Sequence, residues 1–273
     1  MSNYKMVVLD LDGTTCLPLD NIVESNIEPI KQVIKKGVRV VFATGRPIKA
    51  KFNNLEKFEF SELHSIGIGF NGATIYDLLN KKEIAAFPLE KEKATKVFNL
   101  LKKPEFKECI LCAYTVQDDI TYVTKKIEES KDLEFESKLF EKPATIYDDS
   151  YEMFDCYKIL VFNANEEFKQ EVINIGLEIA WSKQSLSGEI TRKGVNKKLA
   201  VEYLSNMFKV DPINILAMGD GENDVEMLKY AGLSIAPKNA CDNAKSNAKV
   251  VSEFKDADGV VGIELNNYIL KED

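Results

Sequence analysis

Met6-Val-Val-Leu-Asp-Leu-Asp-Gly-Thr14 joins an uninterrupted apolar run to two carboxylates that stand two residues apart. The apolar part is typical of a parallel β-strand that is covered on both faces. Ligands of open α/β sheets bind at the carboxyl ends of the strands, so Asp10 and Asp12 would open onto a crevice. Paired carboxylates there can divide the work between a nucleophile or metal ligand and a proton donor. The D-x-D pattern alone is weak evidence, because acids are common in the turns that follow strands.

Three further blocks place polar residues at the ends of predicted strands or at the start of a helix. The strand Val38–Ala43 ends in Thr44-Gly-Arg46, and the strand Ile213–Met218 ends in Gly219-Asp-Gly-Glu-Asn-Asp224. Between them, Lys193-Gly-Val-Asn-Lys197 begins a helix. These blocks support the interpretation of the first stretch as part of a site rather than a simple turn.

In this order, Asp-x-Asp-Gly-Thr, a strand-terminal Thr, a Lys and Gly-Asp-x-x-x-Asp resemble the haloacid dehalogenase (HAD) superfamily. The stretches Ala43–Arg46, Asn71–Ala73 and Gly219–Asp224 are similar to its Cof-type sugar-phosphate phosphatase branch. The resemblance implies an α/β fold, with a Rossmann-like doubly wound parallel-sheet core and an inserted α+β cap domain of the C2 type. It also implies a Mg²⁺-dependent phosphatase that hydrolyses small phosphorylated metabolites, sugar phosphates in particular, through an aspartyl-phosphate intermediate.

The resemblance also implies roles for individual residues. Asp10 would be the nucleophile, and Asp12 would protonate the leaving oxygen and then activate water. The implied Mg²⁺ ligands are Asp10, Asp12 through its backbone carbonyl, Asp220, and Asp224 directly or through water. The residues implied in substrate or phosphate binding are Thr44, Gly45, Arg46, Asn71, Lys197 and Asn223. Thr44 and Lys197 are also expected to be catalytic, because a hydroxyl and a compact cation would hold the transferred phosphoryl group.

Several of these residues have simpler structural interpretations. Thr44 could cap its strand, Lys197 could be a solvated helix residue, and Asp224 could be a charge at a helix N-terminus. Lys193 competes with Lys197 for the phosphate, and Arg46 could brace the core instead of holding substrate. For the whole chain, the alternatives are a phosphomutase that uses the same aspartyl-phosphate and a non-catalytic metabolite-binding regulatory protein.

The spacing of the blocks indicates where a second domain is inserted. A loop, a helix and a strand fill the interval from Asp12 to Thr44, whereas the interval from Thr44 to Lys197 is far longer than one crossover needs. We therefore expect a catalytic core from residues 1–88 and 189–273, with an inserted domain at 89–188 that sets substrate specificity. A capping box at Ser25–Glu28 predicts the start of the first helix.

Composition limits the partners and the location of the protein. The 273 residues are 45% hydrophobic and 29% charged, as in a globular protein. A formal net charge of −8 argues against binding to nucleic acid or to an anionic membrane, whereas a metal ion and a few local cations still permit a phosphate substrate. No apolar run is long enough for a transmembrane helix, and the first strand begins too early for a signal peptide, so we expect a cytoplasmic protein. No pattern indicates the oligomeric state.

Other patterns carry less weight. Cys109-Ile-Leu-Cys112 has the C-x-x-C spacing, but without a second Cys or His pair it does not indicate a zinc site. His64 is the only histidine and is expected to be structural. The stretch Gly67–Gly72 matches G-x-G-x-x-G, but strand-like sequence follows it instead of the helix that a dinucleotide site needs. Thr15 and Lys198 depart from the family pattern, which usually has leucine and often has glycine at these positions.

Overall fold

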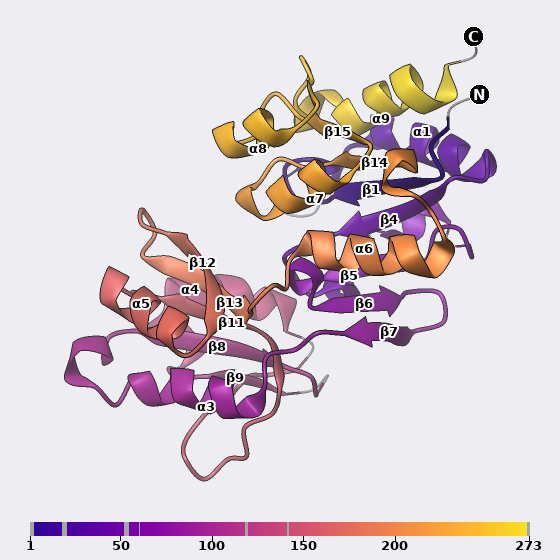
Figure 1. Ribbon diagram of the computed structural model, residues 1–273. Coiled ribbons are helices and arrows are strands. Elements are labelled where there is room, and N and C mark those ends of the chain that lie inside the picture. Colours follow the sequence, from indigo (N-terminus) through magenta and orange to yellow (C-terminus); the bar gives the residue numbers. More distant parts are fainter. Residues whose placement is uncertain are drawn as a thin grey trace. The chain divides into compact units, whose positions relative to one another are not determined.

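The protein folds into two compact units, and the chain passes from the first to the second and back (Figure 1). The computed structural model describes residues 3–17, 21–51, 55–59, 61–117, 120–140 and 142–271. One unit consists of Met1–Ala85 and Asn196–Asp273, and the other of Ala86–Val195. The predicted border between residues 188 and 189 falls inside strand β13 (Ser187–Arg192), which has a neighbouring strand on each side in the sheet of the second unit.

An eight-stranded sheet forms the centre of the first unit, with the order β16-β15-β14-β1-β4-β5-β6-β7. Its strands are β1 (Met6–Asp10), β4 (Arg39–Ala43), β5 (Ile66–Gly69), β6 (Thr74–Asp77), β7 (Lys82–Ala86), β14 (Ile215–Met218), β15 (Leu233–Ala236) and β16 (Val250–Val251). The strands from β16 to β5 are parallel, and β6 is antiparallel to β5. The chain order reverses between β1 and β14, which is the switch point where ligands of such sheets bind.

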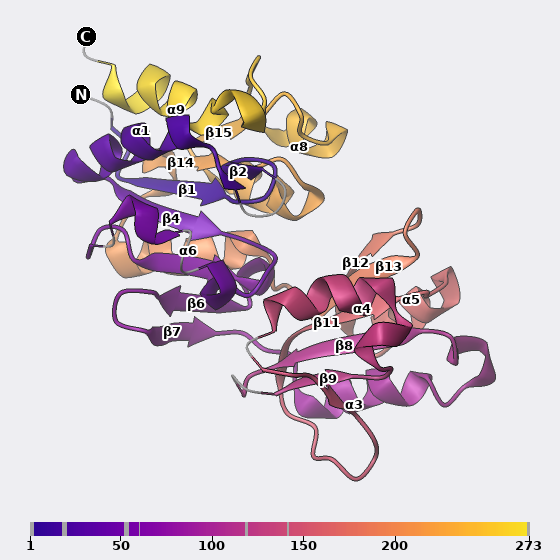
Figure 2. The ribbon, with the colours of Figure 1, turned by 180° about the vertical axis from the view of Figure 1, so that it is seen from behind.

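Helices cover both faces of this sheet (Figures 1 and 2). On one face, α1 (Glu24–Lys35) packs against α9 (Val260–Leu265) and the π-helical turn Asn266–Leu270. On the other face lie α6 (Lys197–Phe208), α7 (Val225–Tyr230) and α8 (Asp242–Asn247). This doubly wound arrangement confirms the predicted fold class, although sequence analysis does not predict α9 or the turn after it.

The first helix begins earlier than its capping box predicts. The box at Ser25–Glu28 does not form, because the helix already starts at Glu24 without a side-chain cap. Pro29 has no N–H to bond the carbonyl of Ser25, and Gly262 of α9 approaches that carbonyl so closely that a Cβ would lie 2.6 Å from it. The close packing of α1 on α9 therefore depends on Pro29 and Gly262 together.

The second unit is an α+β domain with its own hydrophobic core. Its sheet has the order β10-β9-β8-β11-β13-β12 and is antiparallel except between β9 and β10. The other strands of this sheet are β8 (Ile110–Thr115), β9 (Thr121–Val123), β10 (Thr145–Ile146), β11 (Cys156–Phe162) and β12 (Leu177–Ser182). Helices α3 (Lys91–Leu100) and α5 (Glu166–Asn174) cover one face, and α4 (Lys131–Glu136) lies on the other.

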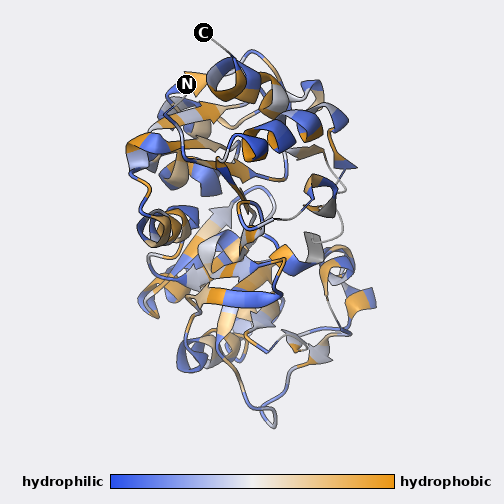
Figure 3. Ribbon diagram, turned by 90° about the vertical axis from the view of Figure 1, so that its right-hand side faces the viewer, coloured by the Kyte–Doolittle hydropathy of each residue, from blue (hydrophilic) through white to orange (hydrophobic). Residues whose placement is uncertain are grey.

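Hydropathy follows this layered construction. Figure 3 shows hydrophobic residues gathered in the strands, whereas the helices carry hydrophobic and hydrophilic residues in alternation, as expected of helices that cover a sheet on one side. In the part of the chain that the structure describes, no helix combines the length and the apolar character needed to cross a membrane.

Candidate active site

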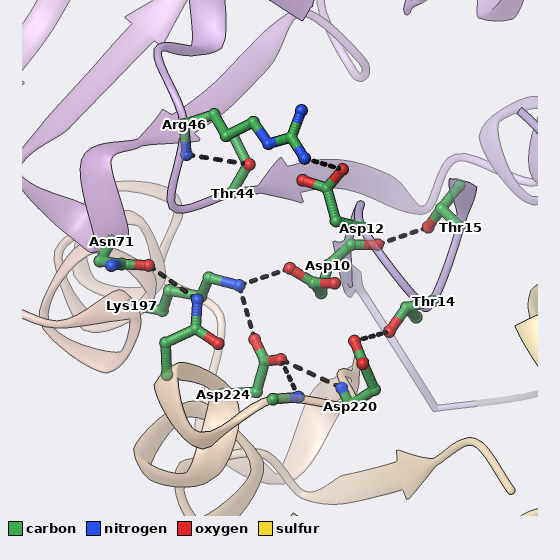
Figure 4. A network of polar contacts seen from close by, with 12 residues as sticks. Asp10, Asp12, Thr14, Thr15, Thr44, Arg46, Asn71, Lys197, Asp220 and Asp224 are labelled. Carbon is green, nitrogen blue, oxygen red and sulfur yellow. Dashed lines mark hydrogen bonds and ion pairs between the residues drawn. The ribbon is translucent and has the colours of Figure 1, made fainter. Parts of the chain in front are cut away.

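The carboxyl ends of four adjacent strands bring the predicted polar residues together (Figure 4). Asp10 is the last residue of β1, and Thr44 follows β4. Asn71 lies in the turn after β5, and Asp220 lies just beyond β14. Lys197 reaches the same place from the first turn of α6. Because β14, β1, β4 and β5 are parallel neighbours, residues from distant parts of the sequence meet at one edge of the sheet.

Lys197 is a fully buried cation between two carboxylates. Its Nζ lies 2.5 Å from Oδ1 of Asp10 and 2.6 Å from Oδ1 of Asp224. Asn196 caps α6 by accepting a hydrogen bond from the backbone N–H of Leu199, and this cap fixes Lys197 at the start of the helix. Burial alone would lower the pKa of Lys197, but the two carboxylates outweigh burial and hold the pKa above its ordinary value. Lys197 is therefore not a solvated helix residue.

The two carboxylate oxygens of the buried Asp10 differ in their partners. Oδ1 accepts the Lys197 ammonium, whereas Oδ2 is buried and accepts no hydrogen bond within the described part of the chain. Burial and the neighbouring Asp224 raise the pKa of Asp10 well above its usual value, although Lys197 pulls it down. Thr15 donates a hydrogen bond of 2.6 Å to the main-chain carbonyl of Asp10, so this departure from the family pattern anchors the end of β1.

Three carboxylates form a group that could hold a metal ion. One oxygen each of Asp10, Asp220 and Asp224 lies within 4.8 Å of the others. Mg²⁺ is a hard cation that takes oxygen ligands, and the buried Oδ2 of Asp10 is an acceptor that the described residues leave without a donor. The donor set therefore fits the cation that the family resemblance implies.

Asp220 and Asp224 differ in their partners within this group. Thr14 donates to Oδ1 of Asp220 at 3.0 Å, and burial and the charge of Asp224 raise the pKa of Asp220. Asp224 accepts Lys197 on Oδ1 and the backbone N–H groups of Asp220 and Gly221 on Oδ2. Both oxygens of Asp224 thus already hold protein donors, which distinguishes this carboxylate from that of Asp10.

Asp12 and Arg46 face each other at a more exposed part of the site. Nη2 of Arg46 lies 3.2 Å from Oδ1 of Asp12, and their side chains are 27% and 32% exposed. The hydroxyl oxygen of Thr44 accepts the backbone N–H of Arg46 at 3.1 Å. This hydrogen bond fixes the Thr44 oxygen while leaving its own proton to be donated to another acceptor.

Asn71 and Asn223 contact each other and join two loops. Nδ2 of Asn223 donates to Oδ1 of Asn71 at 2.8 Å, and the backbone N–H of Asn71 donates to the carbonyl of Thr44 at 3.0 Å. A Cβ on Gly45 would lie 2.9 Å from Oδ1 of Asn71, so the amide of Asn71 lies directly against Gly45. Every predicted site residue therefore lies in the first unit, in two groups of residues that contact one another around Lys197 and around Asn71.

Sequence analysis misses some contacts that hold the site. The hydroxyl of Thr14 donates to Asp220, 206 positions away in the sequence. Nδ2 of Asn239 donates to the carbonyl of Gly13 at 2.8 Å and so holds the turn between Asp12 and Thr14. Hydroxyl and amide side chains are the only signal for such roles, and they do not reveal a partner so far away in the sequence.

Two other lysines, Lys193 and Lys198, lie near Lys197 in the sequence. Lys193 belongs to the second unit, whereas Lys197 belongs to the first. Lys198 is paired with Glu202 along α6 at 2.5 Å, and its ammonium also lies 5.5 Å from the centre of the Tyr230 ring. The extra cation at position 198 therefore has one partner on its own helix and another on α7.

Comparison with known proteins gives the family. The model of haloacid dehalogenase-like hydrolases matches residues 7–263. MG265 of Mycoplasma genitalium, which bears the name "putative phosphatase", is 26% identical over 268 residues, covering 92% of this chain and 93% of its own. The 5-amino-6-(5-phospho-D-ribitylamino)uracil phosphatase YwtE of Bacillus subtilis is 27% identical over 281 aligned residues, covering 94% and 95%. The solved structure of the HAD subclass IIB sugar phosphatase BT4131 has the same fold, with a TM-score of 0.78, 23% identity, and 97% and 98% coverage.

The chain therefore belongs to the haloacid dehalogenase-like hydrolase family. Within this family it is an enzyme of the phosphatase class and of the Cof type. The predictions of family and enzyme class are thus confirmed.

Proposed function

We propose that this protein is a Mg²⁺-dependent phosphatase that hydrolyses small phosphorylated metabolites, sugar phosphates in particular, through a phosphorylated Asp10. The observation that carries the proposal is the buried pair of Asp10 and Lys197, beside a carboxylate oxygen that receives no donor from the described residues. A buried ion pair with a purely structural role would have its remaining lone pairs satisfied. An open oxygen beside a fixed cation instead suits a carboxylate that receives a phosphoryl group.

The proposed reaction has two steps that share one intermediate. A carboxylate oxygen of Asp10 attacks phosphorus, so that a new P–O bond forms while the bond to the leaving oxygen breaks, and Asp12 gives that oxygen a proton. Asp12 then takes a proton from water, whose oxygen attacks the phosphorus, releases inorganic phosphate and restores the carboxylate of Asp10. Asp12 suits proton exchange because its side chain is 32% exposed, whereas that of Asp10 is 6% exposed.

The surrounding residues would bind and orient the phosphoryl group. The ammonium of Lys197, the hydroxyl of Thr44 and the side-chain amide of Asn223 can face the charge that gathers on its oxygens. We assign the backbone of Gly45 to the same cradle. Arg46 would hold Asp12 through their ion pair and approach the leaving group from the more exposed part of the site.

The three carboxylates of Asp10, Asp220 and Asp224 mark the place where the metal would bind. We assign Asp10 and Asp220 as side-chain ligands and the backbone of Asp12 as a third ligand. Mg²⁺, when bound, neutralises carboxylate and phosphoryl charge at this point. Asp224 holds Lys197 and the loop after β14 with both of its oxygens, so we propose that it reaches the ion only through water.

Two observations support a small phosphorylated substrate. YwtE, which aligns with nearly the whole chain, is named for a phosphorylated ribityl compound, which carries its phosphate on a sugar-alcohol chain. The formal net charge of −8 opposes a polyanionic macromolecule as substrate. We further propose that the second unit sets the choice among such metabolites and that the enzyme works in the cytoplasm, where they are found.

Phosphate release tests the proposed function. The protein is incubated with p-nitrophenyl phosphate and with a panel of sugar phosphates, each with Mg²⁺ or with EDTA, and Asp10→Asn serves as the inactive control. We expect Mg²⁺-dependent release of inorganic phosphate that EDTA abolishes. An isomerised sugar phosphate without free phosphate would indicate a phosphomutase. No turnover across the panel, combined with thermal stabilisation by a metabolite, would indicate a binding protein.

A further inference from the structure

Three consecutive residues after β5 have a left-handed backbone. The angle φ is 50° at Phe70, 56° at Asn71 and 100° at Gly72. Glycine adopts this conformation freely and asparagine tolerates it, but a bulky side chain such as that of Phe70 is strongly disfavoured there. Outliers of this kind persist only where their surroundings hold them, and they gather at functional sites.

The contacts of this turn show what it holds. The backbone N–H of Phe70 donates to the carbonyl of Arg46 at 3.1 Å, and that of Asn71 donates to the carbonyl of Thr44 at 3.0 Å. At Gly72 the backbone approaches the carbonyl of Asn196 so closely that a Cβ would overlap it. The turn therefore joins the loop after β4 to the first residues of α6, both of which carry residues of the proposed phosphate cradle.

The side chain of Asn71 extends this connection to a third segment. Its Oδ1 accepts Nδ2 of Asn223, while Oδ1 of Asn223 lies so near Gly221 that a Cβ there would come within 2.5 Å. The amide of Asn223 is therefore hydrogen-bonded at its nitrogen and lies close to Gly221 at its oxygen. An amide nitrogen has two hydrogens, so the bond to Asn71 occupies one and leaves the second in a defined direction.

We propose that Asn71 is a positioning residue for Asn223 and does not itself bind the substrate. The left-handed turn brings its carbonyl oxygen to Asn223, and this bond directs the second Nδ2 hydrogen of Asn223 at the phosphoryl oxygens. This inference rests on the proposed function and replaces the substrate contact that sequence analysis predicts for Asn71. Glycine is the natural test residue at position 71, because it keeps the left-handed backbone and removes only the amide.

A double-mutant cycle separates positioning from direct binding. The variants are Asn71→Gly, Asn223→Ala and both together, assayed for kcat and KM with p-nitrophenyl phosphate and Mg²⁺. By analogy with other charge-stabilising donors, Asn223→Ala should lower kcat by about 10²-fold, and Asn71→Gly should lower it less, by about 10-fold. If Asn71 acts through Asn223, the double variant should lose no more than Asn223→Ala alone. Two independent substrate contacts would instead multiply to about 10³-fold and overturn the inference.

Asn163→Gly is the matched control. Asn163 is an exposed residue of the second unit with the same φ of 56°, so the chemical change is the same as at position 71 and is made at the same positive φ. We expect its kcat and KM to equal those of the wild type. A loss at Asn163 similar to that at Asn71 would assign the effect to the backbone and count against a role for the amide.

Binding of inorganic phosphate, measured by calorimetry with Mg²⁺, gives a second cycle on the same variants that needs no turnover. We expect the loss of affinity in Asn71→Gly to disappear when Asn223 is already Ala. A wild type that neither hydrolyses the substrate nor binds phosphate would overturn the proposed function, and the inference would fall with it. An active wild type with additive losses would overturn the inference alone.

Discussion

The ammonium of Lys197 lies 2.5 Å from Oδ1 of Asp10, although 187 positions separate the two residues in the sequence. Neither side chain has more than 6% of its surface exposed. Two charges taken out of water in this way stabilise a protein little as a pair, but removing one of them leaves the other buried and uncompensated. The pair therefore contributes little to stability, and its role is in the active site.

Lys197→Met should destabilise the metal-free protein by about 3–5 kcal/mol, because Asp10 and Asp224 lose the cation between them. It should also abolish measurable phosphatase activity. Urea unfolding in EDTA measures the stability. Lys198→Met is the control, since Lys198 is partly exposed and its helix pair with Glu202 should contribute only about 0.5 kcal/mol. Equal losses in the two variants would contradict the role given to the buried ion pair.

Asp10→Asn should be inactive and yet raise the melting temperature of the metal-free protein. Burial and Asp224 raise the pKa of Asp10 in the folded state, so its ionised form opposes folding at neutral pH, and a neutral amide of the same shape relieves this. Lys197 keeps Asp224 as its partner. Mg²⁺ should stabilise the wild type by mass action and the variant less. Calorimetric melting of the wild type and the variant, in EDTA and in Mg²⁺, measures both effects. A melting temperature in EDTA that is lower for Asp10→Asn than for the wild type would contradict the prediction.

Asp12→Asn should lose activity in proportion to the need of the leaving group for a proton. The loss should be about 10²–10⁴-fold on alkyl phosphates such as sugar phosphates. It should be smaller on p-nitrophenyl phosphate, whose leaving group departs without protonation. The ratio of kcat/KM on the two substrates measures this effect in wild type and variant. An unchanged ratio would remove Asp12 from the role of general acid.

The strand ends of the site are predictable because apolar runs identify parallel strands and the topology of such sheets brings their carboxyl ends together. Asp10, Thr44 and Asp220 follow from this alone. The pairing of Asn71 with Asn223 does not, because it depends on the left-handed turn after β5. The dipeptide Asn71-Gly72 signals a turn but not the residue that the turn will face.

Elements with weak local signals account for the rest of what sequence analysis misses. Helix α4 is short and mostly charged, and its clearest mark is Ser130, whose side chain accepts the backbone N–H of Leu133. The helix that begins at Val260 follows Gly259, a left-handed residue without a capping side chain. The predicted domain border falls inside β13 because the spacing of the motifs does not reveal which sheet a strand joins.

His64 should make the protein acid-sensitive. It is fully buried between the rings of Phe42 and Phe58, and burial lowers its pKa to about 4. The unfolded chain takes up a proton near the ordinary value of about 6.5. The stability that depends on the neutral ring is therefore fully present above a pH of about 6.5. It is lost as the pH falls toward 4, and the total loss in the free energy of unfolding is about 3 kcal/mol.

Urea unfolding at pH 7.5 and 4.5 compares the wild type with His64→Gln, which cannot titrate. The wild type should lose more of its free energy of unfolding between these two values than the variant does. Parallel losses would show that other groups cause the acid sensitivity.

Gly72→Ala should damage both stability and activity, whereas Gly37→Ala should cost only the backbone strain. Both glycines are left-handed, with φ of 100° and 80°, and an added Cβ meets nothing within 4 Å at Gly37. The strain alone is about 1–2 kcal/mol. At Gly72 the Cβ would overlap the carbonyl of Asn196, so the start of α6 must move and carry Lys197 with it. A shift of about 1 Å in a catalytic group can cost about 10²-fold in rate. Urea unfolding and kcat for both variants measure this difference, and equal behaviour of the two would show that the contact between Gly72 and Asn196 does not position Lys197.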